Sequence, residues 1–117
     1  MPLIDVHIGS AVAYHLFDVS AFHDFLIGKD MWDVPRGVLQ LNVTRSPEGM
    51  LYPETDLYLS IRAKAKKDRT PERVKAIMEK MEKWLTNAGM PKGKIRVELY
   101  EPSLQFAHGW NGAKAKL

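Results

Sequence analysis

Residues 57 to 100 read LYLSIRAKAKKDRTPERVKAIMEKMEKWLTNAGMPKGKIRVELY, and this stretch carries the clearest structural signals of the chain. At its start, Leu57, Leu59 and Ile61 alternate with polar residues, which is the pattern of a strand buried on one face. Near its end, Ile95 and Val97 begin the same kind of alternation. These two alternating segments predict two strands, and the apolar residues between them predict a helix.

The helix in the middle has clear start and stop signals. Thr70 is a good N-cap and Pro71 suits the first helical position, where its missing N–H costs nothing. Gly89 and Pro91 predict the end of the helix. The apolar residues between these limits recur at helical spacing: Val74, Ile77, Met78, Met81 and Leu85.

The first half of the chain repeats this plan less clearly. Leu3 to Ile8 alternates as a strand, and Val38 to Arg45 does so again. Asp18 or Ser20 can cap a short helix between them, whereas the stretch from Gly9 to Phe17 reads as loose. We expect one domain, 1–117, with pseudo-repeats at about 2–45 and 56–101, a linker at about 46–55 and a tail at 102–117.

Two α+β folds fit the order β-α-β, β-α-β. In the ferredoxin-like fold the two halves interleave within one sheet. In the alternative, the halves lie side by side as one four-stranded sheet with both helices on one face. The two strands of each half are far enough apart to be parallel and joined by a crossover helix. The pattern alone leaves both folds open.

Composition limits the classes of partner. The net charge of +3 is mild and dispersed, which argues against nucleic acid but suits an anionic small molecule if the arginines converge. The chain has no cysteine, which excludes disulfides, thiolate metal sites and cysteine nucleophiles. No apolar stretch is long enough to span a membrane, and the start does not read as a signal peptide.

These features lead us to expect a cytoplasmic protein. The last three residues, Ala115 to Leu117, are a conservative variant of a peroxisomal address. That address has meaning only in a eukaryote, and a frayed lysine-rich tail is the simpler interpretation.

The N-terminus and the second half together resemble the tautomerase superfamily. The chain opens Met1-Pro2 and runs directly into a strand. The segment from Lys67 to Glu72, the long helix, the strand around Arg96 and the late Phe106 resemble the repeat unit of 4-oxalocrotonate tautomerase. The ending resembles the macrophage migration inhibitory factor branch. The length, with residues 56–58 and 69–70, is most similar to the 5-carboxymethyl-2-hydroxymuconate isomerase branch.

The resemblance implies the side-by-side fold and a catalytic role for Pro2. After removal of Met1, the proline nitrogen is a secondary amine that acts as a general base or acid. An apolar pocket beside arginines disfavours its charged form, which lowers its pKa towards the working pH. The alternative is an ordinary Met-Pro start, since proline also suits the first residue of a strand. If Met1 stays in place, Pro2 is an amide and cannot be a base.

Three arginines are candidates for substrate binding. Arg69 stands just before a helix N-terminus, where a cation is disfavoured unless it shares an anion with the helix amides. Arg96 matches the strand arginine of the short tautomerases, and Arg36 is the corresponding residue of the first half. The alternative for each is a surface arginine, paired with Asp68 or Glu72 in the case of Arg69.

The resemblance also implies which aromatic residues line the pocket and how many copies of the chain assemble. Phe106 matches the pocket aromatic of the superfamily and Trp110 adds to the wall, although core or trimer packing explains both equally well. The implied protein is a homotrimer that needs no metal and no organic cofactor. The histidines lack the close helical spacing of a metal-binding pair.

We therefore predict an isomerase that moves a proton in a small unsaturated or 2-oxo carboxylate through Pro2. Dehalogenation, hydration or decarboxylation on the same scaffold is the nearest alternative, because a fold does not determine a reaction. In that case Pro2 would be protonated and act as an acid. A cytokine-like binding protein without catalysis is the non-enzymatic alternative.

Overall fold

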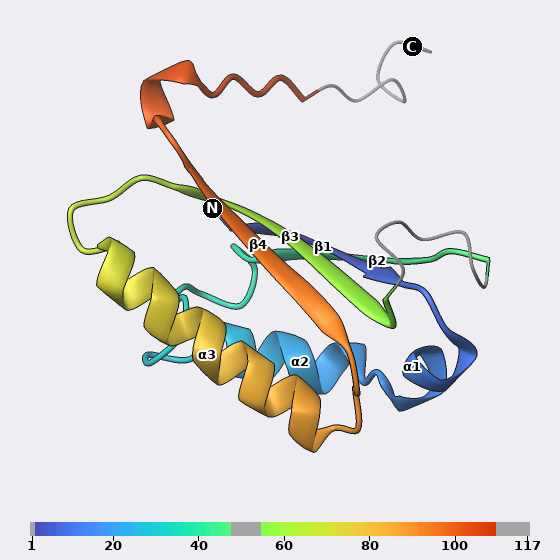
Figure 1. The fold of residues 1–117 in the computed structure, drawn as a ribbon. Helices are drawn as coiled ribbons and strands as arrows, with labels where there is room; N and C mark the ends of the chain where they lie inside the picture. Colours follow the sequence, from blue (N-terminus) through green and yellow to red (C-terminus); the bar gives the residue numbers. More distant parts are fainter. Residues whose placement is uncertain (1, 48–54, 110–117) are drawn as a thin grey trace, which may run out of the picture.

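The computed structural model describes residues 2–47 and 55–109. Its strands and helices lie close to the predicted ranges (Figure 1). Their order is β1 (Leu3–Ile8), α1 (Ala11–Leu16), α2 (Val19–Leu26), β2 (Gln40–Arg45), β3 (Leu57–Lys64), α3 (Pro71–Asn87), β4 (Gly93–Tyr100) and the 3₁₀ helix η1 (Pro102–Leu104). The predicted second strand begins two residues late, at Gln40.

The order of the strands decides between the two candidate folds. The sheet has the order β2-β1-β3-β4. β1 pairs with β2 in parallel and β3 pairs with β4 in parallel, while β1 and β3 meet antiparallel. The two strands of each half are thus neighbours, and the halves lie side by side. This arrangement rules out the interleaved ferredoxin-like fold.

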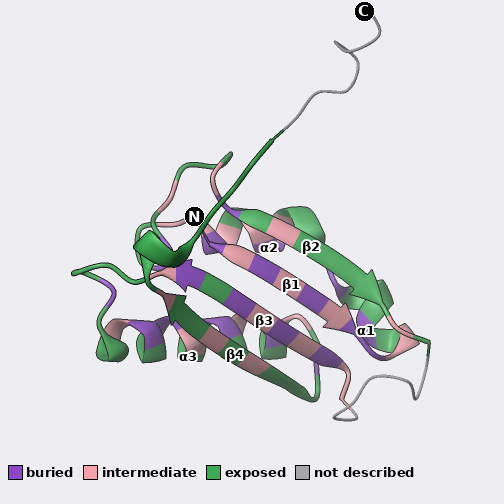
Figure 2. Ribbon diagram, turned by 90° about the horizontal axis from the view of Figure 1, so that it is seen from above, coloured by how far each residue is buried: buried purple, intermediate pink, exposed green. Residues whose placement is uncertain are grey.

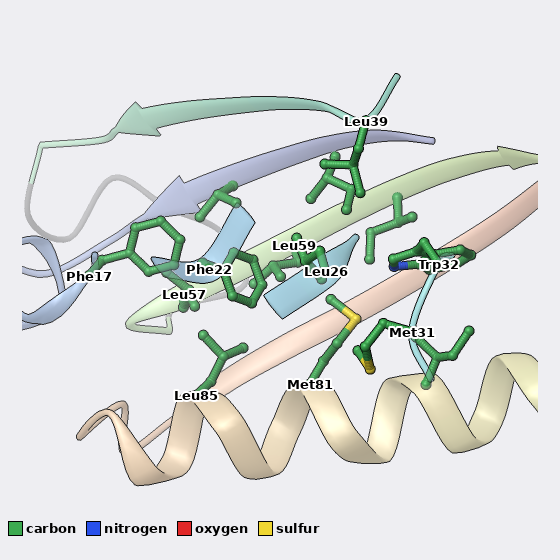
Figure 3. Close-up of a cluster of buried hydrophobic side chains, with 14 of the residues drawn as sticks. Phe17, Phe22, Leu26, Met31, Trp32, Leu39, Leu57, Leu59, Met81 and Leu85 are labelled. Atoms are coloured by element: carbon green, nitrogen blue, oxygen red, sulfur yellow. The ribbon is translucent and has the colours of Figure 1, made fainter. Parts of the chain in front are cut away.

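One face of the sheet is covered by α2 and α3 (Figure 1). Side chains alternate along each strand, so every second residue points towards these helices. Phe22 and Leu26 of α2 and Met81 and Leu85 of α3 are buried in a shared core (Figure 3). The strands contribute Ile4, Val6, Ile8, Leu57, Leu59 and Ile61 to the same core. Among the described residues, no helix is both long and apolar enough to cross a membrane.

The opposite face of the sheet is more open (Figure 2). Asp5 and His7 of β1 are half-buried there, as is Tyr58 of β3. Asn42 donates a hydrogen bond to Asp5 across the parallel pair, at 3.1 Å. None of the helices among residues 2–47 and 55–109 covers this face, which carries polar and charged side chains over an unbroken four-stranded surface.

The prediction of a loose stretch between Gly9 and Phe17 is wrong, because α1 lies there. The Ser10 side chain accepts a hydrogen bond from the backbone N–H of Ala13 and caps the helix. Ala13 is the one buried residue of α1, whereas Val12, Tyr14 and Leu16 are exposed. The helix therefore shows no apolar stripe of helical period, which is the signal that sequence analysis uses.

Of the two proposed caps for α2, Asp18 is the one used. Its carboxylate accepts a hydrogen bond from the backbone N–H of Ala21 at 3.0 Å. α3 begins as predicted, with the Thr70 hydroxyl accepting from the N–H of Arg73 at 3.2 Å. An Asp or Thr N-cap satisfies one of the donors that a helix start leaves free, which contributes about 1 kcal/mol.

α3 ends in a Schellman motif centred on Gly89. Gly89 has a φ of 97° and donates to the carbonyl of Thr86, while Met90 donates to that of Leu85. Both Leu85 and Met90 are buried, as the hydrophobic contact of this motif requires. A Cβ at residue 89 would also lie 3.0 Å from a methyl carbon of Leu16.

Gly89→Ala is expected to lower the free energy of unfolding by more than about 1 kcal/mol, because alanine is strained at positive φ. The new methyl group also crowds Leu16. Gly37→Ala is the matched control, since a Cβ there meets nothing within 4 Å. Urea titration of both variants measures the difference. Equal stability of the two would contradict the assigned helix end.

Candidate active site

Pro2 lies at the beginning of the central strand β1. It is fully buried, and its carbonyl accepts a hydrogen bond from the N–H of Gln40 at 3.0 Å. Extending the strand register by one residue places Pro2 between Leu39 and Ala63. Leu39 and Ala63 are both buried, so the surroundings of Pro2 are apolar. Met1 lies outside the described residues.

Arg69 is anchored at the same end of the sheet. Its side chain donates from Nη1 to the carbonyl of Lys64 at 2.9 Å. Lys64 follows Ala63, the residue that stands opposite Pro2 in the extended register. Arg69 is therefore held where β1 starts and β3 ends, directly before the N-terminus of α3.

Arg69 is unusually buried for an arginine, with 7% of its surface exposed. Its guanidinium lies over the ring of Trp32, with Cζ 5.7 Å from the ring centroid. Burial lowers the pKa of Arg69, and nearby Asp68 acts in the opposite direction. The side chain nevertheless stays charged at neutral pH, because the ordinary pKa of arginine is so high. The alternative interpretation, an exposed arginine paired with Asp68 or Glu72, does not describe this buried side chain.

A small recess surrounds this arginine. It has a volume of about 20 Å³ and is lined by Met31, Trp32, Asp33, Lys66, Asp68, Arg69, Arg73 and Ile77. Pockets that hold a whole ligand are typically about 300–1,000 Å³. The recess therefore admits one small polar group in the single chain.

A larger cavity than this recess lies elsewhere among the described residues. A groove of about 580 Å³ runs between α3 and β4, with Met78, Leu85 and Ile95 among its walls. It reaches Gly93 and Leu57, which pair with each other at the far end of β1, beside Ile8. The groove contains none of the predicted site residues. We assign the candidate site to the recess because Pro2 and Arg69, the two residues with a chemical rationale, lie at that end.

The other two arginines do not join this recess. Arg36 precedes β2 and forms an ion pair with Asp24, and both side chains are more than half exposed. Arg96 lies in the middle of the edge strand β4, where its Nη2 is 2.8 Å from a carboxylate oxygen of Glu98. Within one chain, both residues therefore fit the alternative interpretation, that of an ordinary surface arginine. Exposed pairs of this kind contribute little to stability.

Of the two aromatic residues predicted for the pocket wall, Phe106 makes little contact with the rest of the described chain. Phe106 is 88% exposed on the segment that follows η1. This segment leaves the sheet on the side opposite α2 and α3 (Figure 1). Trp110 and the tripeptide 115–117 lie outside the described residues. Within the described ranges, no group of three or more His, Asp or Glu side chains is arranged to hold a metal.

Sequence reasoning did not single out Trp32. Trp32 is 3% exposed and its ring packs under Arg69, near the end of the sheet where Leu39 also lies (Figure 3). One signal was available: Met31 and Trp32 form an isolated apolar pair within a polar, turn-rich stretch. Such a pair indicates a loop that is anchored in a core.

Comparisons with known proteins agree with this fold. The sequence matches no protein-family model and no curated protein. The structure is similar to a native fused 4-OT, with a TM-score of 0.63 and 12% identity over 97% of each chain. It is also similar to malonate semialdehyde decarboxylase, with a TM-score of 0.61 and 14% identity over 98% of each chain.

A third similar structure comes from a family named for a different reaction, dehalogenation. It is a member of the cis-3-chloroacrylic acid dehalogenase family, with a TM-score of 0.63 and 17% identity, covering 92% of this chain and 81% of that one. At these identities the similarity establishes the fold alone. These neighbours are members of the tautomerase superfamily, and the chain has the tautomerase fold.

Proposed function

We propose that this chain is a cofactor-independent isomerase in which Pro2 moves a proton within a small unsaturated or 2-oxo carboxylate. The observation that carries the proposal is that a buried Pro2 in apolar surroundings and a buried, charged Arg69 lie at the same end of the sheet. After removal of Met1 the Pro2 nitrogen is a free amine. In apolar surroundings its charged form is disfavoured, so the neutral base is populated near neutral pH.

The proposed reaction has two proton transfers. The Pro2 amine takes a proton from a carbon next to the substrate carbonyl, and the electron pair of the broken C–H bond moves into an enolate. Arg69 binds the carboxylate and favours the negative charge that develops. The protonated amine then returns the proton to another atom of the enolate, which completes the isomerisation and restores the neutral base.

The pH dependence of turnover tests whether Pro2 starts the reaction as a base. For an isomerase, the rate of phenylpyruvate enol–keto interconversion should rise with pH as the Pro2 amine loses its proton, because the neutral amine is the active form. Initial rates between pH 5 and pH 9 measure this. A rate that instead falls as the pH rises would favour an acid role for Pro2.

An acid role belongs to the second candidate class, a decarboxylase, hydratase or dehalogenase. Its support is that one neighbour is a malonate semialdehyde decarboxylase and another belongs to a dehalogenase family. The resemblance to the 5-carboxymethyl-2-hydroxymuconate isomerase branch favours the isomerase, with the exact substrate left to assay. A binding protein without catalysis predicts that Pro2 tolerates substitution without loss of function.

We also propose that the working form is a homotrimer. The recess at Arg69 is too small for a whole substrate, so further walls must come from outside the described chain. The open sheet face and the exposed Leu104 and Phe106 are surfaces that a neighbouring copy can cover. One structural neighbour, a fused 4-OT, is described as a symmetric trimer.

The mass of the particle in solution tests this assembly. Light scattering on a size-exclusion column at micromolar concentration should give three times the mass of one chain. In a trimer, Phe106, Arg36 and Arg96 become available to the site of a neighbouring copy, although they do not reach the recess of their own. A mass equal to one chain at these concentrations would contradict the proposed assembly.

A further inference from the structure

Trp32 is held in an unusual position by the loop between α2 and β2. Its backbone N–H donates to the carbonyl of Leu26 at 3.0 Å, and that of Asp33 donates to Gly28 at 3.0 Å. Asp33 has a φ of 50°, which is uncommon for a residue other than glycine. The loop therefore turns sharply directly after Trp32. Strain of this kind is retained where the surrounding structure fixes a particular geometry.

The loop is also attached to α3. The guanidinium of Arg73 donates to the carbonyl of Lys29 at 3.5 Å, and the ammonium of Lys80 donates to that of Asp30 at 3.3 Å. Both contacts lie on the side of the loop that precedes Trp32. They connect the loop to the helix whose N-terminus follows Arg69, so the ring and the guanidinium are supported by the same two elements.

The ring of Trp32 supports one face of the Arg69 guanidinium. The cation lies 5.7 Å from the ring centroid, within the range of a cation–π contact. A guanidinium has five N–H donors, and among the hydrogen bonds between described residues one uses this side chain, to Lys64. The remaining donors are free to bind an anion, while the ring and the Lys64 carbonyl hold the plane of the group.

The indole N–H of Trp32 has no partner among the described residues, although it is fully buried. A buried donor without a partner is unfavourable, so hydrogen bonding does not explain why tryptophan stands here. The face of the ring is the part of the side chain that makes a specific contact, and that contact is with Arg69. Phenylalanine would keep such a face and lose no hydrogen bond.

The charges around the recess indicate what Arg69 binds. Three cations line it, Lys66, Arg69 and Arg73, together with two carboxylates, Asp33 and Asp68. The net charge of the lining is therefore +1, which one carboxylate balances. Once one carboxylate has neutralised this charge, the lining has no net positive charge left to bind a second carboxylate of the same substrate.

We propose that Trp32 is a positioning residue, whose ring holds the Arg69 guanidinium in the orientation that binds the carboxylate of a monocarboxylate substrate. This rests on the proposed function of the site. Loss of the ring leaves the charge of Arg69 in place but lets the guanidinium adopt other orientations, which weakens binding of substrate. The reaction at Pro2 is affected less, because Trp32 does not take part in the proton transfer.

Substitution of Trp32 tests the proposal through the division between KM and kcat. Trp32→Leu should raise KM for phenylpyruvate about 10-fold, which corresponds to about 1.4 kcal/mol and lies within the range of a cation–π contact, with kcat changed less than 3-fold. Trp32→Phe should stay within about 3-fold of the wild type in KM. Trp84→Leu is the matched control, since Trp84 stacks on Phe25 in the core and does not contact Arg69. An equal rise of KM in the Trp84 and Trp32 leucine variants would overturn the proposal.

A binding measurement that needs no turnover makes the test independent of the reaction. With Trp84 and Trp110 both changed to phenylalanine, Trp32 is the single tryptophan. Titration with 3-phenylpropionate, a monocarboxylate probe, should change its emission in a saturable way, because the anion docks on the cation above the ring. The same probe should leave the emission unchanged when Arg69→Met is added. A response that survives Arg69→Met, or no response in a folded variant, would overturn the inference.

The two kinds of failure can be told apart. If phenylpyruvate is not turned over but Trp32 emission still responds to 3-phenylpropionate through Arg69, the proposed function fails and the positioning role of Trp32 holds. If turnover is normal and Trp32→Leu leaves KM unchanged, the proposed function holds and the positioning role is overturned. Should Trp32→Leu fail to fold, the emission titration of the single-tryptophan variant decides the matter.

Discussion

Pro2→Ala is expected to reduce the turnover of phenylpyruvate by about 100-fold or more. A positioned general base contributes typically 10²- to 10⁴-fold, and the Pro2 nitrogen is the base in the proposed reaction. The variant keeps an N-terminal amine, but this primary amine is no longer held in a ring at the start of β1. The measurement compares kcat and KM of the two proteins, with intact mass to show that Met1 is absent from both.

A second variant separates the amine from the side chain. An uncleaved N-terminal extension leaves Pro2 in place but turns its nitrogen into a tertiary amide, which cannot accept a proton. We expect this protein to fold normally and to show no proline-dependent turnover. Pro102→Ala, at the exposed first position of η1, is the proline control and should keep full activity. Unchanged turnover in the extended protein would exclude Pro2 as the base.

Arg69→Ala is expected to lower kcat/KM by about 100-fold, which corresponds to about 2.7 kcal/mol of transition-state stabilisation. The substitution removes the cation that binds the substrate carboxylate and favours the developing enolate. Arg69→Lys keeps a charge but not the planar fork of donors, so it should recover only part of the activity. Steady-state kinetics of the three proteins measure the effect.

Arg69 also supports the fold, so stability must be followed in parallel. Its removal leaves the buried end of β3 without the donor to Lys64, which is expected to cost about 1–3 kcal/mol of unfolding free energy. Arg45→Ala is the matched control, because Arg45 lies over the ring of Tyr14 at 4.7 Å at the opposite end of β1. Similar losses of kcat/KM in the Arg45 and Arg69 variants would argue against a specific anion site.

The elements of the second half were predictable because their signals are local. Thr70 and Pro71 mark the start of α3 through the backbone donors that any helix leaves free, and Gly89 marks its end through positive φ. The alternation along β3 follows from burial of one face alone. α1 was missed for the same reason, since its apolar residues are mostly exposed and show no period.

The candidate site also combines features that the sequence predicted with features that depend on long-range strand pairing. Pro2 was predicted from the resemblance to the tautomerase superfamily, and Arg69 from the same resemblance and its place before a helix. Their placement at the same end of the sheet depends on the antiparallel pairing of β1 with β3, for which no short segment carries a signal. The separation of Arg36 and Arg96 from the recess depends on the edge positions of β2 and β4.

By itself, then, the sequence determined the strands and the long helix, because periodicity and capping record the immediate surroundings of each residue. It indicated Pro2 and Arg69 as candidates through the resemblance to a family. The tertiary structure confirmed the side-by-side arrangement of the halves, which the strand pattern had left open. It alone decided that Arg69 is buried and that Trp32 lies beneath its guanidinium. The pairing of β1 with β3 and the packing of Trp32 against Arg69 both join segments that are distant in the sequence. Such contacts depend on how the strands pair and the loop folds back, which local patterns do not encode.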